Sequence, residues 1–239
     1  MPFISGLTQL RSLSIVGMAK NTGKTECLNY VLRRLWEEYP QVSLALTSIG
    51  IDGERRDQVT QTDKPEICLH PGTVFVTAEK FYRNKLVAAE VVGIDEQYTT
   101  SLGRAIYAKS KGTGKVLIAG PASTGGLKHI IRKMRDRDID LTIIDGALSR
   151  ISLAAPSVSE GMILATGAAY SVQPEELIPK THHLYRLIQL PEFPSRAIAE
   201  NLADAERGMF VIDAEGNIFE TGFISALSDR IWQDVEWLQ

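Results

Sequence analysis

The sequence contains few of the residues that hold small secreted or metal-dependent proteins together. It has two cysteines, Cys27 and Cys68, which stand far apart and form no Cys-x-x-Cys pair. With four histidines and no Cys/His cluster at zinc spacing, neither a disulfide scaffold nor a zinc site is expected. We therefore expect a reduced intracellular protein with two ordinary core or surface thiols.

Long apolar runs and a strong excess of one charge are also absent. No segment approaches the roughly 18–20 apolar residues that a bilayer crossing needs, and the N-terminus lacks the pattern of a signal peptide. The 26 basic and 29 acidic residues give a formal net charge of −3, whereas a general nucleic-acid binder is usually strongly basic. We expect a cytoplasmic protein that binds neither membranes nor nucleic acid.

The proportions of apolar and charged residues are those of an ordinary globular protein. The 239 residues are 44% hydrophobic and 23% charged, which excludes a disordered chain and a collagen-like fibre. A chain of this length can bury a stable core without a metal or a disulfide. One large domain, or one domain with a small appendage, is therefore expected.

Short apolar segments alternate with helical patterns along most of the chain. We expect strands at 13–16, 42–47, 73–77, 116–119, 141–144 and 162–165. We expect helices at 25–39, 126–137, 174–181 and 195–206. Continuous apolar runs, rather than alternating ones, indicate strands that are buried on both faces of a parallel sheet. The pattern predicts an α/β fold with a mostly parallel central sheet and helices on both faces.

The C-terminal residues have a different pattern. Two apolar segments, 209–212 and 217–220, flank a turn and predict a hairpin, and a helix is expected at 225–238. Residues 200–239 carry nine acidic and two basic residues, a net charge of −7. This acidity suits either a solvated edge or a docking face for a basic partner. We predict a main domain at 1–190 and a C-terminal extension at 191–239 that packs on it.

The strongest motif is the segment 17–25, Gly-Met-Ala-Lys-Asn-Thr-Gly-Lys-Thr. It follows an apolar strand and opens an amphipathic helix, which is the context of a phosphate-binding P-loop rather than of a chance tripeptide at a helix start. Backbone N–H groups of such a loop point at anionic oxygens, and Gly23 permits their close approach. Lys24 can then reach the β- and γ-phosphates of ATP, and the Thr25 hydroxyl can bind Mg²⁺. The residues expected to contact the nucleotide are Gly17, Lys20, Asn21, Thr22, Gly23, Lys24, Thr25 and Glu26.

The spacing of the two loop glycines is unusual. Five residues separate Gly17 from Gly23, where the common pattern has four, because Met18 occupies the usual glycine position. This longer loop resembles the phosphate loops of dethiobiotin synthetase and its relatives. It does not match the loop of the arsenite-pump and nitrogenase-iron-protein group, whose extra lysine would fall at Ala19. Lys20 is one position away, so a role for Lys20 between the subunits of a homodimer is only a hypothesis.

Two acidic residues at strand ends are candidates for holding Mg²⁺. Asp145 follows the apolar segment 141–144 in a Walker B pattern, with a helix N-cap as the alternative. Asp52 follows the second strand, in a segment that acts as a switch in the dethiobiotin-synthetase-like class. If Asp52 does not hold the metal, Glu54 is the next candidate. The alternative interpretation is that Asp52 and Gly53 form an ordinary surface turn. We predict Lys24, Asp52 and Asp145 as catalytic residues. We predict Thr25, Asp52 and Asp145 as the residues that hold the metal.

Three further strand-end loops and one basic segment have open interpretations. The loop 120–126 could offer N–H donors to an anion or simply connect a strand to a helix. Arg150 could face a transferring phosphate or lie on the surface, and 166–169 could contact the nucleotide base. The segment 109–137 carries eight basic residues and one acidic residue, which suits a solvated helix face, an acidic partner or a phosphorylated ligand.

Three blocks of residues together resemble a bacterial family found with amino-acid fermentation genes. They are 17–25, 46–54 and 144–150, and the resemblance spans about residues 12–190. The family is the ATP-binding reactivase subunit associated with lysine 5,6-aminomutase and ornithine 4,5-aminomutase. Met18 and Lys20 agree with its loop, whereas Ile51 stands where relatives have arginine.

The resemblance implies a role beside enzymes that use adenosylcobalamin and pyridoxal phosphate. A reactivase would use ATP to release damaged cobalamin, working with the aminomutase subunits and a second ATPase related to mismatch-repair proteins. Our main hypothesis is a Mg-dependent ATPase whose 48–56 loop relaxes on loss of the γ-phosphate. The alternatives are a small-molecule ligase or kinase of the dethiobiotin synthetase type, with a pocket near Ser123, Thr124 and Thr47, and a non-catalytic interaction module with a vestigial P-loop.

Overall fold

The computed structural model describes most of the N-terminal three quarters of the chain and part of the remainder. The described residues are 3–52, 66–100, 103–147, 158–190, 202, 209–213 and 215–222. They belong to two compact units, Met1–Leu177 and Ile178–Gln239. The division between the units falls inside a helix and earlier than the boundary after residue 190 that the sequence suggested.

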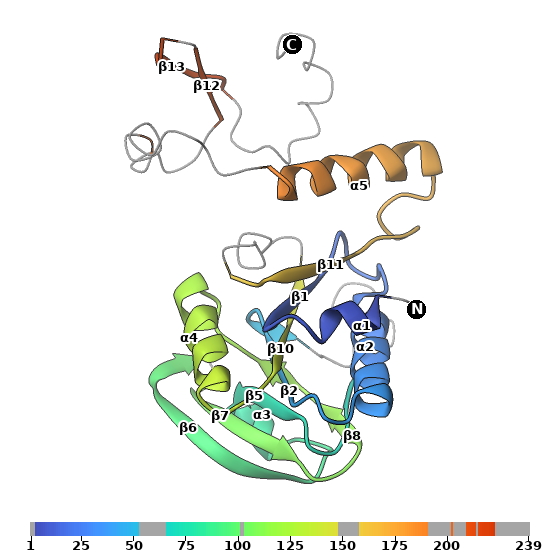
Figure 1. The fold of residues 1–239 in the computed structure, drawn as a ribbon, viewed down its shortest axis with the longest axis vertical. Coiled ribbons are helices and arrows are strands. Elements are labelled where there is room, and N and C mark those ends of the chain that lie inside the picture. Colours follow the sequence, from blue (N-terminus) through green and yellow to red (C-terminus); the bar gives the residue numbers. More distant parts are fainter. Residues whose placement is uncertain are drawn as a thin grey trace. The chain divides into compact units, whose positions relative to one another are not determined.

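The first unit is built around a seven-stranded sheet with the strand order β11-β1-β10-β2-β5-β7-β6 (Figure 1). The strands are β1 (Ser12–Gly17), β2 (Leu44–Ser48), β5 (Val74–Ala78), β6 (Ala89–Thr100), β7 (Gly103–Ser110), β10 (Leu141–Ala147) and β11 (Gly161–Ala165). The five strands from β11 to β5 run parallel, whereas β7 pairs antiparallel with both β5 and β6. The predicted α/β class with a mostly parallel central sheet is therefore confirmed.

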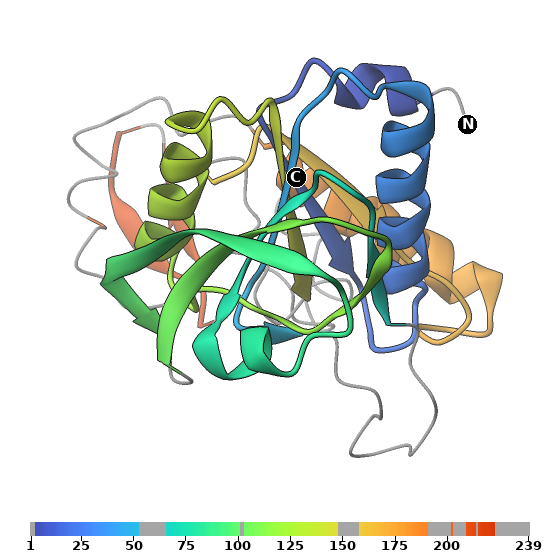
Figure 2. The same cartoon turned by 90° about the horizontal axis from the view of Figure 1, so that it is seen from below.

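Helices cover both faces of this sheet, as the sequence predicted. The helices that begin in the first unit are α1 (Ile4–Leu7), α2 (Lys24–Glu38), α3 (Glu79–Arg83), α4 (Thr124–Arg135) and α5 (Pro174–Ile188). In Figure 2, α2 (blue) and α4 (yellow-green) lie on opposite sides of the strands. Alternate residues of a strand point to opposite faces, so Ile15 packs in the core on the α2 side, while Val16 packs with Leu127 of α4. Two apolar layers thus hold the sheet between the helices.

The predicted strand at 116–119 is not part of the seven-stranded sheet. The chain there forms β8 (Gly114–Val116) and β9 (Ile118–Ala119), which pair antiparallel with β4 (Ile67–Leu69) and β3 (Ile51–Asp52), respectively. Val116 of β8 and Ile118 of β9 are buried in the core, so the apolar run was correctly identified as interior, but a short run does not reveal its pairing partners. The extended conformation at 116–119 is therefore confirmed for most of the segment, whereas its expected place in the central sheet was wrong.

The antiparallel hairpin of β6 and β7 was not predicted. Charged residues and register shifts between Val91 and Gly93 and between Asp95 and Thr99 interrupt its alternation. Gly103 opens β7 with a φ of +106°, which favours glycine, and the strand that follows is rich in Ala, Ile and Tyr. A glycine turn between two β-rich segments is the signal that could have revealed the hairpin.

The predicted helices 25–39 and 126–137 correspond to α2 and α4, which each begin slightly earlier than expected. The helix predicted at 174–181 is longer, because α5 continues to Ile188 and includes Pro179. Leu184, seven residues after Leu177, is buried and continues the helical apolar spacing beyond the expected end. The expected helices at 195–206 and 225–238 lie outside the described residues, apart from Leu202.

In the second unit, the structure describes part of α5 and one antiparallel strand pair. The strands are β12 (Phe210–Ile212) and β13 (Ile218–Glu220). Between them, Asp213 accepts hydrogen bonds from the Glu215 and Asn217 N–H groups, at 3.0 and 2.7 Å. These hydrogen bonds hold the Asp213 pKa below its ordinary value, the Asn217 contacts contributing most. The acidic turn is thus fixed by its own carboxylate.

Candidate functional site

The glycine-rich segment forms a closed loop between β1 and α2. Asn21 and Gly23 have positive φ angles of 63° and 83°, a region that glycine adopts freely and asparagine tolerates. The Thr22 hydroxyl donates to the Ala19 carbonyl at 3.0 Å, and the Met18 N–H donates to the Ala165 carbonyl of β11 at 2.9 Å. The loop is therefore fastened both to itself and to the neighbouring strand.

Gly17 has to be glycine for this loop to close. A Cβ atom at Gly17 would lie 2.8 Å from the Thr22 hydroxyl oxygen and 3.4 Å from Cβ of Lys24. At the other end, α2 begins at Lys24 directly after Gly23, so Lys24, Thr25 and Glu26 form its first turn. Backbone N–H groups of a first turn have no acceptor inside their own helix. The N-terminus of α2 beside the loop therefore offers backbone donors of the kind that bind anions.

The structure brings the loop lysine and the strand acid together. Lys24 Nζ lies 2.6 Å from Asp145 Oδ1, and the Asp145 side chain is completely buried, while 14% of the Lys24 side chain is exposed. Asp145 lies opposite Ile15 of β1 on one side and Ser48 of β2 on the other. A buried carboxylate needs a nearby cation, and Lys24 supplies it. Asp145 does not end its strand as expected, because β10 continues to Ala147, so a helix N-cap is excluded.

The segment after β2 is tied to Asp145 through the main chain. The Ile49 N–H donates to the Asp145 carbonyl at 2.8 Å, and a Cβ at Gly146 would lie 2.9 Å from the Ile49 side chain. Further along, Asp52 lies in β3, opposite Ile118 of β9. The side chain of Asp52 and the whole of Glu54 lie outside the described residues, so their predicted place beside the metal stays a prediction.

The loop after β9 packs against the same segment. The Gly120 N–H donates to the Gly50 carbonyl at 2.8 Å, and the Gly50 N–H donates to the Pro121 carbonyl at 3.2 Å. A Cβ at Gly120 would lie 1.9 Å from the Ser48 carbonyl oxygen, so only glycine fits there. Sequence analysis missed this junction, since contacts between main-chain groups leave little trace in the pattern of side chains.

Two residues of the pocket expected for a small acid are placed by the structure. Thr47 is fully buried, and its hydroxyl has no hydrogen-bond partner among the described residues. The Ser123 hydroxyl accepts a hydrogen bond from the Gly126 N–H at 3.2 Å and caps α4. This cap supports the interpretation of 120–126 as a strand-to-helix connection.

The remaining predicted contacts are placed only in part. Thr166 directly follows β11, and the Gly167 carbonyl accepts the Tyr170 N–H at 2.8 Å in the next turn. Arg150 lies outside the described residues, so its role beside a phosphate stays a prediction. Lys20 is exposed on the loop, and its role in a homodimer stays a hypothesis.

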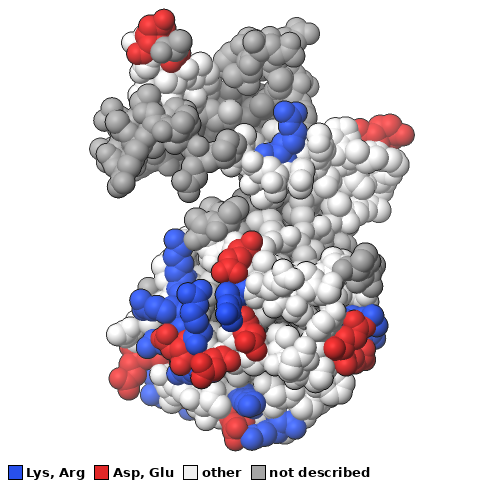
Figure 3. Space-filling model, viewed as in Figure 1, with Lys and Arg blue, Asp and Glu red and all other residues white. Residues whose placement is uncertain are grey.

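Several of the basic residues at 109–137 have partners within the fold. Lys111 lies 2.8 Å from Glu90, and Lys115 lies 2.5 Å from Glu66. The Arg137 guanidinium lies over the Tyr107 ring, 4.8 Å from its centre. On the face drawn in Figure 3, acidic side chains lie directly beside the basic ones near α4. Ion pairs with described acidic residues therefore balance the charge of two of the eight basic residues, Lys111 and Lys115.

A buried polar network joins α4 to the β6–β7 hairpin, and sequence analysis missed it. The Tyr107 hydroxyl donates to Asp95 Oδ2 at 2.5 Å, and His129 Nε2 lies 2.8 Å from the same oxygen. Arg132 of α4 lies 3.2 Å from the other His129 nitrogen. Burial, followed by the contact with Asp95, raises the pKa of Tyr107. This network fixes the hairpin against α4 and lies outside the loop site.

The described residues offer no competing metal site or membrane segment. They contain no cluster of three or more His, Cys, Asp or Glu side chains that could hold a metal ion. No helix within the same ranges combines the length and apolar character that a bilayer crossing requires. Cys27 and Cys68 form no disulfide, and burial raises the pKa of the Cys27 thiol.

Among the described residues, the loop 17–25 with its contact to Asp145 is the strongest candidate for a functional site. Comparison with protein families, curated proteins and solved structures finds no match to this chain.

Proposed function

We propose that the protein binds ATP at the loop 17–25 with Mg²⁺ and hydrolyses it. The observation that carries the proposal is the 2.6 Å contact between Lys24 Nζ and Asp145 Oδ1. It joins a glycine-closed loop at a helix N-terminus to an acid on the adjacent parallel strand. A phosphate site needs a mobile cation next to N–H donors, and a metal site needs a carboxylate close to the phosphates.

The residues around the loop fit both groups. The turn 17–23 and the first turn of α2 would hold the phosphates, and Lys24 would turn from Asp145 toward them. Thr25 directly follows Lys24 in the first turn of α2. Its hydroxyl and the carboxylates of Asp145 and Asp52 are the oxygen ligands that we assign to Mg²⁺. The bound metal would supply positive charge that offsets the charge on the phosphates.

We further propose that the protein serves as a nucleotide-dependent switch for a cobalamin-dependent aminomutase. The resemblance of the segments 17–25, 46–54 and 144–150 to aminomutase reactivase subunits supports this role. The attachment of Ile49 to Asp145 also supports it, since the main chain after β2 is held at the residue that we assign to the metal. The partners would be the aminomutase subunits and the mismatch-repair-like ATPase.

The nucleotide proposal is tested by calorimetric titration of Mg-ATP and Mg-GTP into the protein. We expect Mg-ATP binding in the wild type and no measurable binding in Lys24→Ala, because the loop loses its cation. Lys128→Ala is the matched control, since Lys128 is an exposed helix lysine with no ion pair among the described residues. Unchanged Mg-ATP affinity in Lys24→Ala would show that the loop is not the nucleotide site.

The switch proposal needs a separate measurement. An adenosylcobalamin-dependent aminomutase that turnover has inactivated is incubated with ATP, free cobalamin and the protein. We expect activity to return with the wild type and with Lys128→Ala, but not with Lys24→Ala. If the protein binds ATP but the activity does not return, the nucleotide-binding proposal stands and the reactivase proposal is overturned.

A further inference from the structure

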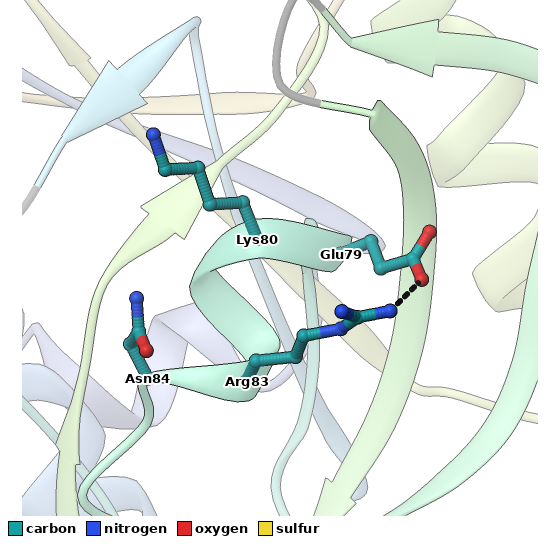
Figure 4. A pocket seen from close by; sticks show the side chains of 4 residues that line it. All are labelled: Glu79, Lys80, Arg83 and Asn84. Carbon is teal, nitrogen blue, oxygen red and sulfur yellow. Dashed lines mark hydrogen bonds and ion pairs between the residues drawn. The ribbon is translucent and has the colours of Figure 1, made fainter.

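A basic hollow lies at the same edge of the sheet as the phosphate loop. It has a volume of about 400 Å³, and the described residues that line it are Glu79, Lys80, Arg83 and Asn84 (Figure 4). The hollow is largely open to solvent, and Lys80, Arg83 and Asn84 are exposed. The four residues come from α3 and the position that directly follows it.

The position of α3 places this hollow at the ligand-binding side of the sheet. α3 begins directly after β5, and β5, β2, β10 and β1 are successive parallel neighbours. Ligands of such sheets bind beyond the carboxyl ends of the strands. Three strand intervals separate β5 from β1, or about 14 Å at the usual strand spacing. The hollow is therefore distinct from the phosphate loop but close enough for two ligands to bind side by side.

The charge in and around the hollow is positive. The Arg83 guanidinium donates to Glu79 Oε1 at 2.8 Å, and Arg104 of β7 donates to Glu79 Oε2 at 3.3 Å. The hydrogen bonds from Arg83 and then Arg104 lower the pKa of Glu79 and keep it ionised. Two arginines thus share this single carboxylate. The Lys80 ammonium forms no ion pair with Glu79, so the described charged residues Lys80, Arg83, Arg104 and Glu79 together carry a net charge of two positive units. An anion is the ligand that would balance this charge.

Two of the four lining side chains carry polar groups that no described residue uses. Residues four apart share one face of a helix, so Lys80 lies beside Asn84, and Glu79 lies beside Arg83. In Figure 4, Lys80 and Asn84 extend on one side of α3, whereas Arg83 reaches toward Glu79 on the other. Within the described part of the chain, the Lys80 ammonium has no ion pair and the Asn84 amide has no hydrogen bond. Both remain available to a ligand.

We infer that this hollow binds a small organic anion that carries a carboxylate or a phosphate group. Lys80 and Arg83 supply the charge, and Asn84 supplies an amide donor and acceptor. Glu79 holds Arg83 in place, and its carboxylate can also accept a hydrogen bond from a donor group of the ligand. The inference does not rest on nucleotide binding, because none of these residues belongs to the loop 17–25 or to Asp145.

The test is a titration followed by amide NMR signals, with succinate as the carboxylate probe and inorganic phosphate as the phosphate probe. We expect one of the two probes to shift the amide signals of residues 79–84. Lys80→Gln with Arg83→Gln should weaken this binding about tenfold, as expected for two partly exposed charge-assisted contacts. Lys80→Arg should retain it within about twofold, because the charge is kept. Lys128→Gln is the control for the loss of an exposed helix lysine.

A second variant separates the hollow from the phosphate loop. Phosphate bound only at the loop would be lost in Lys24→Ala, whereas binding in the hollow should persist there. The inference is overturned if neither probe shifts the signals of α3, or if the double variant binds as tightly as the wild type. Because Lys80 and Arg83 are exposed, we expect the double variant to keep the wild-type circular dichroism spectrum, which checks that it folds.

Discussion

The ion pair of Lys24 and Asp145 has a consequence for stability that requires no ligand. The Asp145 side chain is completely buried, and its partner ammonium lies 2.6 Å away. A carboxylate that leaves water loses hydration free energy, which a cation at this distance offsets. Removal of the cation alone should therefore destabilise the folded state by more than the loss of an ordinary surface lysine.

We expect Lys24→Ala to lower the free energy of unfolding by about 2–4 kcal/mol. Loss of one partner from a fully buried pair costs about 3–5 kcal/mol, and the 14% exposure of the Lys24 side chain reduces that cost. Lys128→Ala, on the exposed face of α4, should change the stability by less than about 0.5 kcal/mol. Urea denaturation followed by far-UV circular dichroism, without nucleotide, measures both values.

A double-mutant cycle isolates the contribution of the pair. Asp145→Asn leaves the Lys24 ammonium without its carboxylate, and Lys24→Ala leaves the buried Asp145 carboxylate without its cation. The double variant removes both charges. We expect the double variant to lose less stability than the two single losses added together, by about 1–3 kcal/mol. Strict additivity, or a Lys24→Ala value equal to that of Lys128→Ala, would refute the stabilising role of this contact.

Two further predictions concern the strand junctions and the buried network. Gly120→Ala should cost about 2–3 kcal/mol, since the new Cβ would lie 1.9 Å from the Ser48 carbonyl oxygen, whereas Gly112→Ala, which has open space, should be nearly neutral in the same thermal denaturation. Burial raises the pKa of Tyr107 above its ordinary value of 10.0 in the folded state only, so this residue supports folding below pH 10 and its contribution is lost as the pH rises further. Tyr107→Phe lacks the hydroxyl that contacts Asp95. Its free energy of unfolding, measured by urea denaturation, should therefore fall less between pH 9 and pH 11 than that of the wild type. Equal falls in the two proteins would contradict the assignment.

The parallel part of the sheet was predictable because its strands are buried on both faces. Leu13 and Val16, for example, pack in different apolar layers, and such strands appear in the sequence as continuous apolar runs. The β6–β7 hairpin was not predictable in the same way, because its exposed residues and irregular register interrupt the apolar pattern. The run at 116–119 shows the limit of the approach, since burial identifies an interior segment but not its neighbours.

The candidate site, like the fold, was predictable from the sequence only in part. The expectation that Lys24 and Asp145 lie close together followed from two strands that end at the same edge of one sheet. The pairing of Asp95 with His129, 34 residues apart, depends on how α4 lies across the hairpin, which no local pattern specifies. The hollow at α3 was missed for a similar reason, because part of its positive charge comes from Arg104 of β7, which reaches Glu79 only in the folded chain.

The main-chain contacts around Asp145 explain why glycine occurs where the loops of this edge meet. Ile49 bonds to the Asp145 carbonyl, Gly50 exchanges hydrogen bonds with Gly120 and Pro121, and the next residues lead to the cap of α4. Each link uses N–H and carbonyl groups, so backbones must approach within hydrogen-bond distance, and a side chain at Gly120 would prevent it.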